Sequence, residues 1–446
     1  MTTVSLFREW LCGFLPGLLL LFLAGCASHS SKLAPVITEL TGHNIDAALQ
    51  ILEEEDLPSR DRLLLLMNRG LLLRLKGDFS ESNQEFSTAK QLVEEFNAIS
   101  LREQAMALTI NDTTRSYAGA PYEQVLLNIY SALNYLDLGQ ADAARVEVLQ
   151  VDLKLAALAG EDAGPLFDND PLARYLSGII YEAGGEYSDA MIAYRSAYQA
   201  YQQHGKRYSL AVPRQLKTDL LRNSERMGLE DENSRYQEQF GIDSWQGTNA
   251  LQRQGELVFL FHNGLVPVKI EQSLMVPVQN SSRIQFVRIA LPEYLRRPAG
   301  FSAARISING HEATTERVEN IEELAVAELA GNMPGIIARS AARAVLKYQV
   351  SKETGKQNDL AGLLVNLAGV LTERADTRSW LTLPAEIQLA RIPIEPGIYD
   401  LKVELLDMAG RVTQRLDYPA VVLEAGKKTF LSYHGIHEVS LLRRRQ

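Results

Sequence analysis

The chain has 446 residues, of which 46% are hydrophobic, so it is long enough to bury one or more cores. Its 45 basic and 55 acidic residues are mixed along the sequence and give a net charge of −10. This argues against nucleic acid as a partner, because that function usually needs a concentrated cationic face. With two cysteines in all, the chain is also too poor in thiols for a disulfide-stabilised fold.

The first predicted element is a signal peptide over residues 1–25. The run from Leu11 to Leu23 is almost wholly apolar, but its 13 residues fall short of the roughly 20 that a membrane-spanning helix needs. The run ends in Leu23-Ala24-Gly25-Cys26, the pattern of a bacterial lipobox. We therefore expect cleavage before Cys26 and attachment of a lipid to its thiol, a suitable nucleophile. The alternative is an ordinary secretory signal with an incidental cysteine.

This start resembles that of a bacterial lipoprotein. Two or three acyl chains, at about 0.8 kcal/mol per buried methylene, would hold the mature chain on a membrane. Lipoproteins that stay in the inner membrane of Gram-negative bacteria tend to carry Asp after the cysteine, whereas this chain has Ala27. The resemblance thus implies a lipid anchor in the outer membrane. The sequence does not determine which way the protein faces, and we take the periplasmic side as our expectation. Residues 26–32 are expected to form a short polar tether of roughly 25 Å.

Residues 33–245 have a helical pattern that contains a repeat. Three copies share the spacing of the tetratricopeptide (TPR) repeat: Gly70, Gly77, Ser82, Phe86 and Ala89; Ala132, Tyr135, Gly139, Ala144 and Val148; and Gly178, Tyr181, Gly185, Ala190, Tyr194 and Ala197. The first small residue of a copy lets two helices approach closely, and the following glycine makes the turn between them. The intervals between copies are irregular, so the alternative is a helical bundle with coincidental spacing.

Two stretches between these helices are candidates for contacts. Tyr117, Pro121, Tyr122 and Glu123 surround a Gly/Pro turn before a helix. They form either a helix start, for which proline is well suited, or a recognition surface for a partner. Asp170, directly before a proline, has the pattern of a helix N-cap.

Residues 246–440 are interpreted as a β-rich domain. Strands are predicted over 256–261, 266–270, 274–278, 284–291, 305–308, 401–405 and 420–423. Asn309-Gly310 is a strong hairpin signal, and Leu401, Val403 and Leu405 alternate with charged residues, as in a strand with one buried face. Short strands at this spacing indicate a β-sandwich-like domain. The expected fold class is α + β, with TPR-like helical repeats followed by this domain.

A helical insertion is expected within the β-rich domain, at about 321–375. Arg339, Arg343 and Lys347 recur every four residues there and make one cationic stripe. This stripe either binds phosphate or carboxylate groups of a glycan or partner protein, or is a solvated face. The apolar positions from Leu360 to Leu371 keep a helical period and indicate a buried helix, with an interfacial membrane anchor as the alternative.

The sequence contains no catalytic constellation: HExxH, GxSxG, a P-loop and GxGxxG after a strand are all absent. Its seven histidines are scattered, and the close pair His434 and His437 has only Glu438 beside it, so we expect no metal site. We expect a protein without enzymatic activity and without a cofactor, apart from the covalent lipid on Cys26.

The chain resembles a family of TPR-containing lipoproteins of Gram-negative bacteria whose activity is not established. The resemblance rests on the lipobox at Cys26, the stretch from Tyr117 to Glu123, residues 170–178, residues 336–348 and the string DTRSWLTLP at 376–384. It implies a cell-envelope protein, with peptidoglycan or its synthesis machinery among the partners, and no particular reaction.

These patterns favour a membrane-anchored adaptor that binds an envelope protein. Stacked helical pairs form a curved surface suited to an extended peptide or a helix, so we expect contacts in the groove of the repeats and at residues 117–123. One alternative is a protein that binds or processes envelope glycans through the cationic stripe. Another is a structural subunit of an envelope machine.

Overall fold

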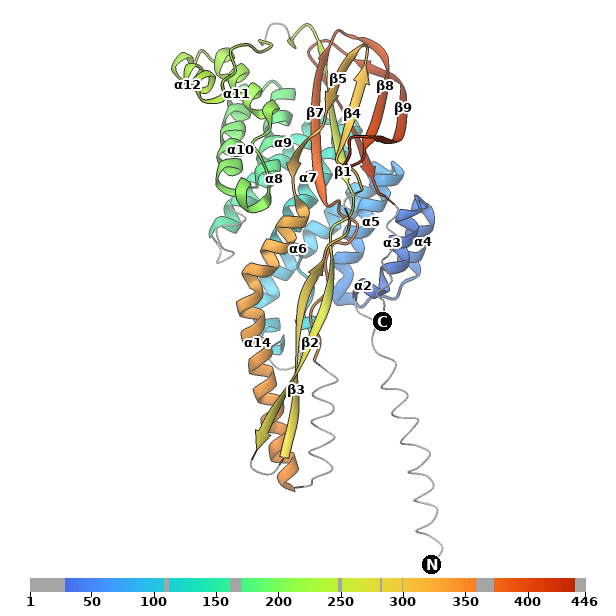
Figure 1. Ribbon diagram of the computed structural model, residues 1–446, viewed down its shortest axis with the longest axis vertical. Coiled ribbons are helices and arrows are strands. Elements are labelled where there is room, and N and C mark those ends of the chain that lie inside the picture. The colour runs from blue at the N-terminus through green and yellow to red at the C-terminus, as the bar shows by residue number, and fades with distance from the viewer. Residues whose placement is uncertain are drawn as a thin grey trace, which may run out of the picture.

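The computed structural model describes residues 29–107, 112–160, 170–247, 251–280, 283–298, 300–357 and 373–437. Helices fill the first part of the chain and strands the second, with one long helix between strands (Figure 1). The helices are α2 (His29–Lys32), α3 (Ala34–Thr41), α4 (Ile45–Glu54), α5 (Arg62–Lys76), α6 (Phe79–Ala107), α7 (Pro121–Asp137), α8 (Ala141–Gly160), α9 (Pro171–Ala183), α10 (Tyr187–Tyr208), α11 (Arg214–Arg226), α12 (Glu230–Phe240) and α14 (Ile321–Gln357). The expected mixture of helices followed by sheet is confirmed.

Several predicted features lie outside the described residues, namely the signal peptide, Cys26 and the apolar segment 360–371. Across the described ranges, no helix is both long and apolar enough to cross a membrane. Residues 29–32 were expected to belong to a free tether, but they form α2, in which Ser30 Oγ donates to the backbone oxygen of Lys269 at 2.9 Å. His29 is buried there, so this part of the expected tether is packed against the protein.

Consecutive helices pack in pairs: α5 with α6, α7 with α8, and α9 with α10. A Cβ atom on Gly178 would lie 2.4 Å from the Tyr194 ring, and one on Gly70 would lie 2.5 Å from the Phe86 ring. The turn residue Gly185 has a φ of +78°, a conformation that favours glycine. These contacts confirm the predicted close approach in the pairs α5–α6 and α9–α10, and the helical half is TPR-like.

The strands form two four-stranded sheets and a two-stranded ribbon. The first sheet has the order β10-β1-β7-β6 and consists of β1 (Gly255–Asn263), β6 (Glu316–Glu319), β7 (Glu386–Ile394) and β10 (Lys428–Gly435); β10 is parallel to β1, and β7 is antiparallel to it. The second sheet has the order β5-β4-β8-β9 and consists of β4 (Ala303–Ile308), β5 (His311–Thr314), β8 (Gly397–Leu406) and β9 (Val412–Leu423). The ribbon pairs β2 (Val268–Asn280) with β3 (Arg283–Leu295).

Two of the predicted strand signals are confirmed, and one prediction is wrong. Asn309 and Gly310, with φ of 48° and 77°, form the turn between β4 and β5. Leu401, Val403 and Leu405 of β8 are buried. The separate strands expected at 266–270 and 274–278 are instead the single strand β2, because β3 pairs with it along its whole length.

The first sheet is buried on both faces. On one face, Phe259 of β1 shares a hydrophobic core with Ile306 and Val403 of the second sheet. On the other face, Val258 belongs to the core of the helical layer, together with Tyr130 of α7. The molecule therefore has three layers, helices on a sheet on a sheet, and β1 lacks the alternation of a half-exposed strand because both of its faces are covered.

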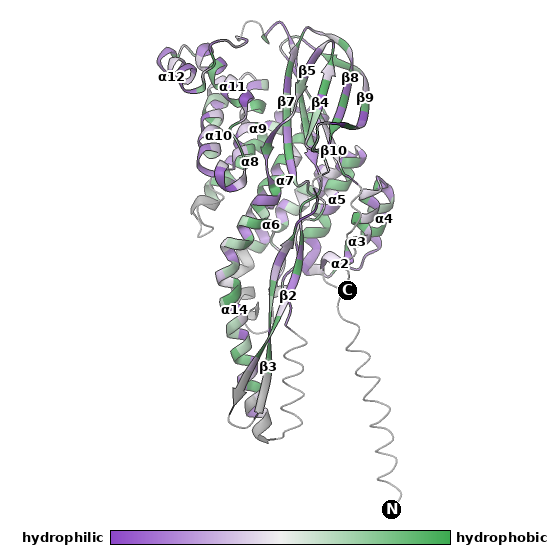
Figure 2. Ribbon diagram, in the orientation of Figure 1, coloured by the Kyte–Doolittle hydropathy of each residue, from purple (hydrophilic) through white to green (hydrophobic). Residues whose placement is uncertain are grey.

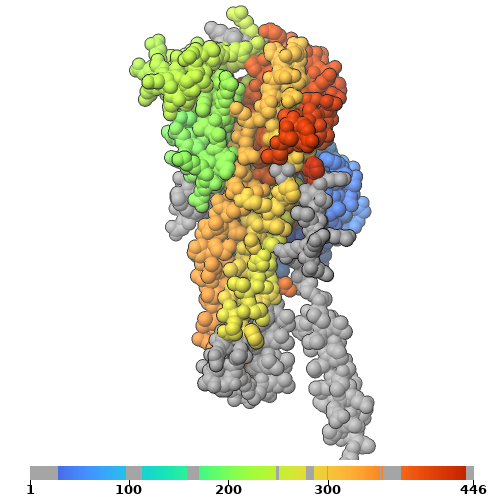
Figure 3. Space-filling view, viewed as in Figure 1, coloured from blue at the N-terminus to red at the C-terminus, as the bar shows by residue number. Residues whose placement is uncertain are grey.

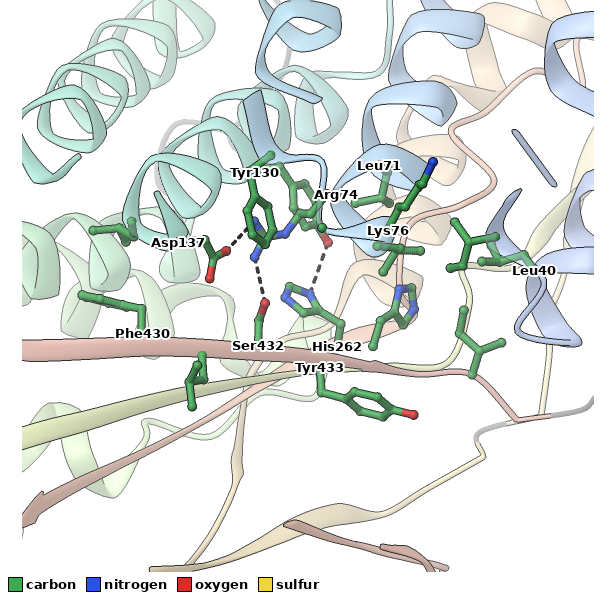
Figure 4. Close-up of a pocket in the computed structure, with 18 of the residues that line it drawn as sticks. Leu40, Leu71, Arg74, Lys76, Tyr130, Asp137, His262, Phe430, Ser432 and Tyr433 are labelled. Atoms are coloured by element: carbon green, nitrogen blue, oxygen red, sulfur yellow. Dashed lines mark hydrogen bonds and ion pairs between the residues drawn. The ribbon is translucent and has the colours of Figure 1, made fainter. Parts of the chain in front are cut away.

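The inner face of the helical layer is filled by the strands of the same chain. Tyr130 lies 3.3 Å, hydroxyl to Nδ1, from His262 of β1, and Arg74 of α5 donates to Ser432 Oγ of β10 at 2.8 Å (Figure 4). Tyr201 of α10 donates to a backbone carbonyl of β6 at 2.7 Å. The expectation of an open groove along this face of the repeats is wrong, because the first sheet occupies it.

Helix α14 and the β2–β3 ribbon extend together from the body as an arm (Figures 1 and 3). The helical insertion is thus confirmed from Ile321 to Gln357. Figure 2 shows apolar residues along the arm, and Leu274, Phe286, Val345 and Val350 are among its exposed side chains.

Asp170 caps α9 as predicted, since its Oδ1 accepts the backbone N–H of Ala173 at 2.7 Å. It interacts with Glu319 at the end of β6, whose side chain is 1% exposed. Burial, and then the Asp170 carboxyl, raise the pKa of Glu319 well above its usual range. In the unfolded chain, the pKa of a glutamate is about 4.3. Because the pKa of Glu319 is higher in the folded protein, protonation of this group stabilises the folded state at low pH. This contribution is lost as the pH rises toward the folded pKa.

We therefore expect Glu319→Gln to raise the free energy of unfolding at about pH 8 by about 1 kcal/mol, and to flatten its decline between about pH 5 and pH 8. The amide keeps an oxygen for the backbone N–H of Asn320, which donates to the Glu319 carboxyl at 2.7 Å. Urea denaturation at both pH values measures this effect. Glu312→Gln, at an exposed position of β5, is the control. Equal pH slopes in all three proteins would contradict the prediction.

Candidate functional site

Residues 115–121 (the 115–121 loop) lead into α7 and end at its first residue, and they separate two cavities. The helical cavity has a volume of about 880 Å³ and lies between α6, α7 and α8. The arm cavity has a volume of about 580 Å³ and lies between the loop, α14, the ribbon and residues 375–378. Both cavities are lined by Arg115, Ser116, Ala118, Gly119 and Pro121. A single short loop is therefore accessible from two sides.

The helical cavity has a wall of paired charges and amides. Lys90 of α6 donates to both oxygens of Glu147 of α8 at 2.7 Å. Asn128 of α7 donates to Glu147 at 2.9 Å and to Gln150 at 2.8 Å. Leu153 adds an apolar side chain that is 73% exposed. This combination suits the backbone groups and an apolar side chain of a peptide.

On its buried side the loop is held by Glu123, whose side chain is fully buried. One carboxyl oxygen accepts the Tyr117 hydroxyl at 2.6 Å and the backbone N–H of Ala120 at 2.9 Å. The other oxygen accepts the backbone N–H of Trp380 at 2.8 Å. Gly119, at φ +79°, provides the sharp bend. Glu123 thereby fixes the loop to residues more than 250 positions away in the sequence.

Arg378 holds the loop from the other side. Its guanidinium donates to both oxygens of Asp376, at 2.9 and 2.7 Å, to Asp61 at 2.9 Å, and to the backbone oxygen of Arg115 at 2.8 Å. It also lies 5.3 Å from the centre of the Tyr117 ring. Burial raises the pKa of Asp376, but the Arg378 guanidinium outweighs this effect and holds that pKa below its usual range. The loop is therefore fixed before any partner binds.

The arm cavity places polar groups of both signs around the loop. Arg339 and Asn332 of α14 line it, together with Lys269 of β2, whose ammonium group donates to the backbone oxygen of Arg378 at 3.1 Å. Glu328 accepts a hydrogen bond from Asn332 at 2.6 Å, and burial raises its pKa. Such a lining suits a ligand with both amide and carboxylate groups.

The structure brings some of the predicted site residues together and separates others. Tyr117 and Pro121 are half-buried and line the arm cavity with Arg339, more than 200 positions away in the sequence. Tyr122 and Glu123, in contrast, are 2% and 0% exposed, so their expected place on the contact surface is corrected to the core. Both residues begin the part of α7, from Tyr122 to Asn134, that is buried throughout.

The cationic stripe is corrected in the same way. The Arg343 side chain is 1% exposed and donates to Glu373 at 3.1 Å, and Lys347 donates to the same carboxyl group at 2.7 Å. Arg339 alone of the three lines the arm cavity. The four-residue spacing places the three cations on one side of α14, as predicted. The chain around Glu373 packs against that side and covers Arg343.

Sequence reasoning missed Lys269, Glu328, Asp376 and Arg378 at this site. The only signal was the string at 376–384, which carried the family resemblance without suggesting a role for its residues. Within the described residues, no three His, Cys, Asp or Glu side chains are grouped so as to hold a metal ion.

No family model and no curated protein matches the sequence. Two solved structures are similar to part of it. One is a protein assigned as a kinesin light chain of Podospora anserina, with nearly identical TPR-like repeats; it is 17% identical, and the match covers 47% of this chain and 91% of that one, with a TM-score of 0.31. The other is the Rap conjugation gene regulator of plasmid pLS20 in complex with the Phr* peptide; it is 14% identical, and the match covers 46% of this chain and 50% of that one, with a TM-score of 0.28.

Proposed function

We propose that this protein is a lipid-anchored adaptor of the bacterial cell envelope, held at the outer membrane through Cys26 and facing the periplasm. It binds a protein partner at the 115–121 loop. In this proposal the two sheets form a β-sandwich that supports the helical layer and the loop.

The observation that carries the proposal is the fixed loop between two large cavities. The loop is held by the buried Glu123 carboxylate and by the Arg378 guanidinium, which donates to Asp376, Asp61 and the backbone oxygen of Arg115. A loop ordered in advance binds with a smaller loss of conformational entropy. The helical cavity offers hydrogen-bonding groups and an exposed leucine, which suit an extended segment of a protein partner.

In-cell photocrosslinking tests the proposal. A benzophenone amino acid at Leu153, in the helical cavity, is expected to capture a defined envelope protein. The matched control carries the same amino acid at Ile398 of β8, which is 67% exposed where Leu153 is 73% exposed. This control should not capture the protein. In a Cys26→Ser variant the adduct is expected to be lost, because the tether no longer concentrates the protein at the membrane.

Other outcomes separate the alternatives. Identical adducts at both positions would contradict a specific surface at the loop. Adducts with peptidoglycan fragments in place of a protein would favour the glycan-binding alternative. An adduct at Leu153 that survives in the Cys26→Ser variant would support the binding surface and contradict the role of the anchor.

A further inference from the structure

The outer side of α14 is apolar where a surface helix usually carries charged residues. From residue 330 to residue 350, every exposed position is uncharged. The large apolar side chains among them are Ile337, Val345, Leu346 and Val350, which are between 46% and 57% exposed (Figure 2). An exposed apolar surface of this length indicates a contact with a partner or a membrane.

The cations of the same stretch lie on the inner side of α14. Arg343 is buried, and Arg339 and Lys347 are half-buried. Arg343 and Lys347 donate to one carboxylate, that of Glu373, and Arg339 lines the arm cavity. α14 therefore keeps its charges on the covered side and its apolar residues on the outer side. This arrangement is typical of a helix that contacts lipid, where charged side chains face the interior of the protein.

The ribbon beside α14 is apolar as well. The residues from 272 to 277 are all exposed and all uncharged. Leu274 and Met275 are 60% and 52% exposed, and as neighbours in β2 they point to opposite faces of the ribbon. Phe286 of β3 is also exposed. Apolar side chains thus face more than one side of the arm, and lipid can contact several sides at once.

The apolar residues of the helix and of the ribbon lie at a similar distance from the body. Lys269 of β2 and Asn332 of α14 both line the arm cavity, at the base of the arm. Leu274 lies roughly 17 Å of strand beyond Lys269, and Val345 lies roughly 20 Å of helix beyond Asn332. Since β3 packs against α14, these residues form one apolar band across the arm.

The first described residues place the anchor beside this arm. Ser30 of α2 is hydrogen-bonded to the backbone of Lys269, and α2 lies at the end of the body from which the arm extends (Figure 1). Cys26 is four positions before Ser30, so its lipid is attached at most roughly 14 Å from the base of the arm. β2 continues to Asn280, roughly 36 Å beyond Lys269. The arm is therefore longer than the tether beside it, and both are at the same end of the body.

We propose that the apolar band of the arm lies in the interface of the membrane that holds the lipid anchor, with Val345 and Leu274 among the upper acyl chains. This inference rests on the anchor of the proposed function. The edges of the ribbon and the exposed Glu353, near the end of α14, are unsuited to the hydrocarbon core, so the band lies about 5–10 Å deep. Anchor and arm together give two membrane contacts and fix the orientation of the body.

Fluorescence of single labelled sites in vesicles tests the proposal. Val345→Cys is labelled with the dye NBD, and the lipidated protein is placed in vesicles of phosphatidylethanolamine and phosphatidylglycerol. The mature anchored protein would have no other free thiol, since Cys12 lies in the signal peptide and Cys26 carries the lipid. We expect nitroxide-labelled lipids to quench the dye at a depth of about 5–10 Å, and aqueous iodide to quench it weakly.

Two further labelled sites complete the experiment. Leu274→Cys, on the ribbon, is expected to report the same depth as Val345→Cys. Val422→Cys of β9 is the matched control, because Val422 is 50% exposed where Val345 is 57% exposed. A dye at this control position should be quenched by iodide and not by the nitroxide lipids.

The outcomes distinguish this inference from the proposed anchor, because flotation with the vesicles reports the anchor and quenching reports the arm. If the protein floats but iodide quenches the dyes at Val345 and Val422 equally, the contact of the arm with the membrane is overturned and the anchor stands. Protection from iodide without quenching by nitroxide lipids would also overturn it, because the arm would then be covered by protein, such as a second copy. A protein that does not float would contradict the anchor and, with it, this inference.

Discussion

Replacing Arg391 with methionine is expected to lower the free energy of unfolding by about 3–5 kcal/mol. The Arg391 side chain lies in β7 and is fully buried. It donates to Glu256 of β1 at 2.7 Å, to Asp219 of α11 at 2.6 Å and to Glu182 of α9 at 3.0 Å. One guanidinium thus joins the first sheet to two helices of the layer above it.

The expected loss comes mainly from the carboxylates that would remain. Burial raises the pKa of Glu256, but Arg391 and Lys428 outweigh it and lower that pKa to about 2. Without Arg391, the cationic partners that the described residues leave to these three buried carboxylates are Arg222 and Lys428. In the native protein, the stability due to Glu256 is complete above its unfolded pKa of about 4.3 and is lost as pH falls toward about 2. Arg391→Met should therefore lose less stability than the native protein as the pH falls from about 4.3 toward about 2.

Urea denaturation of Arg391→Met measures this effect, with Arg415→Met as the matched control. Arg415 is 74% exposed and pairs with Glu404 across β8 and β9 at 2.9 Å, so its loss should cost less than about 1 kcal/mol. If the methionine variant does not fold, Arg391→Lys retains a cation without the planar fork and should show an intermediate loss. Equally small losses at both positions would show that the buried network does not join the layers.

Local features of the sequence predicted local structure well. The spacing of Gly178 and Tyr194 identified a helix pair, because contacts within a pair depend on residues fewer than 20 positions apart. Asn309-Gly310 identified the hairpin for the same reason. The predicted N-cap at Asp170 was also correct. Each of these signals is set by backbone conformation and by neighbours in the same or the next element.

Contacts between distant segments could not be predicted from one sequence. Arg391 joins β7 to α9 and α11, about 170 to 210 positions earlier, and nothing in its own strand identifies those partners. One signal was overlooked: β1 is apolar from Leu257 to Phe261 without alternation, which indicates a strand covered on both faces. That pattern would have predicted that both faces of β1 are covered, although not by which elements.

Glu123→Gln is expected to release the 115–121 loop and to cost about 1–3 kcal/mol. Each Glu123 oxygen accepts a backbone N–H, one from Ala120 and the other from Trp380. An amide has one oxygen and one NH2 group, so in either orientation a buried N–H faces another donor. The variant keeps the size and shape of the side chain, so its effect reports the lost charge and hydrogen bonds of the carboxylate and not a change in packing.

Limited proteolysis distinguishes a local effect from general destabilisation. Trypsin is expected to cleave after Arg115 faster in Glu123→Gln than in the native protein, because the loop is no longer held at Ala120. Glu424→Gln, at a carboxylate that is 58% exposed, is the control and should leave the cleavage rate unchanged. Crosslinking at Leu153 should also be weaker in Glu123→Gln than in the native protein. If the loop must become ordered when the partner binds, the affinity for the partner falls. Faster cleavage with undiminished crosslinking would show that the fixed loop is not part of the contact surface.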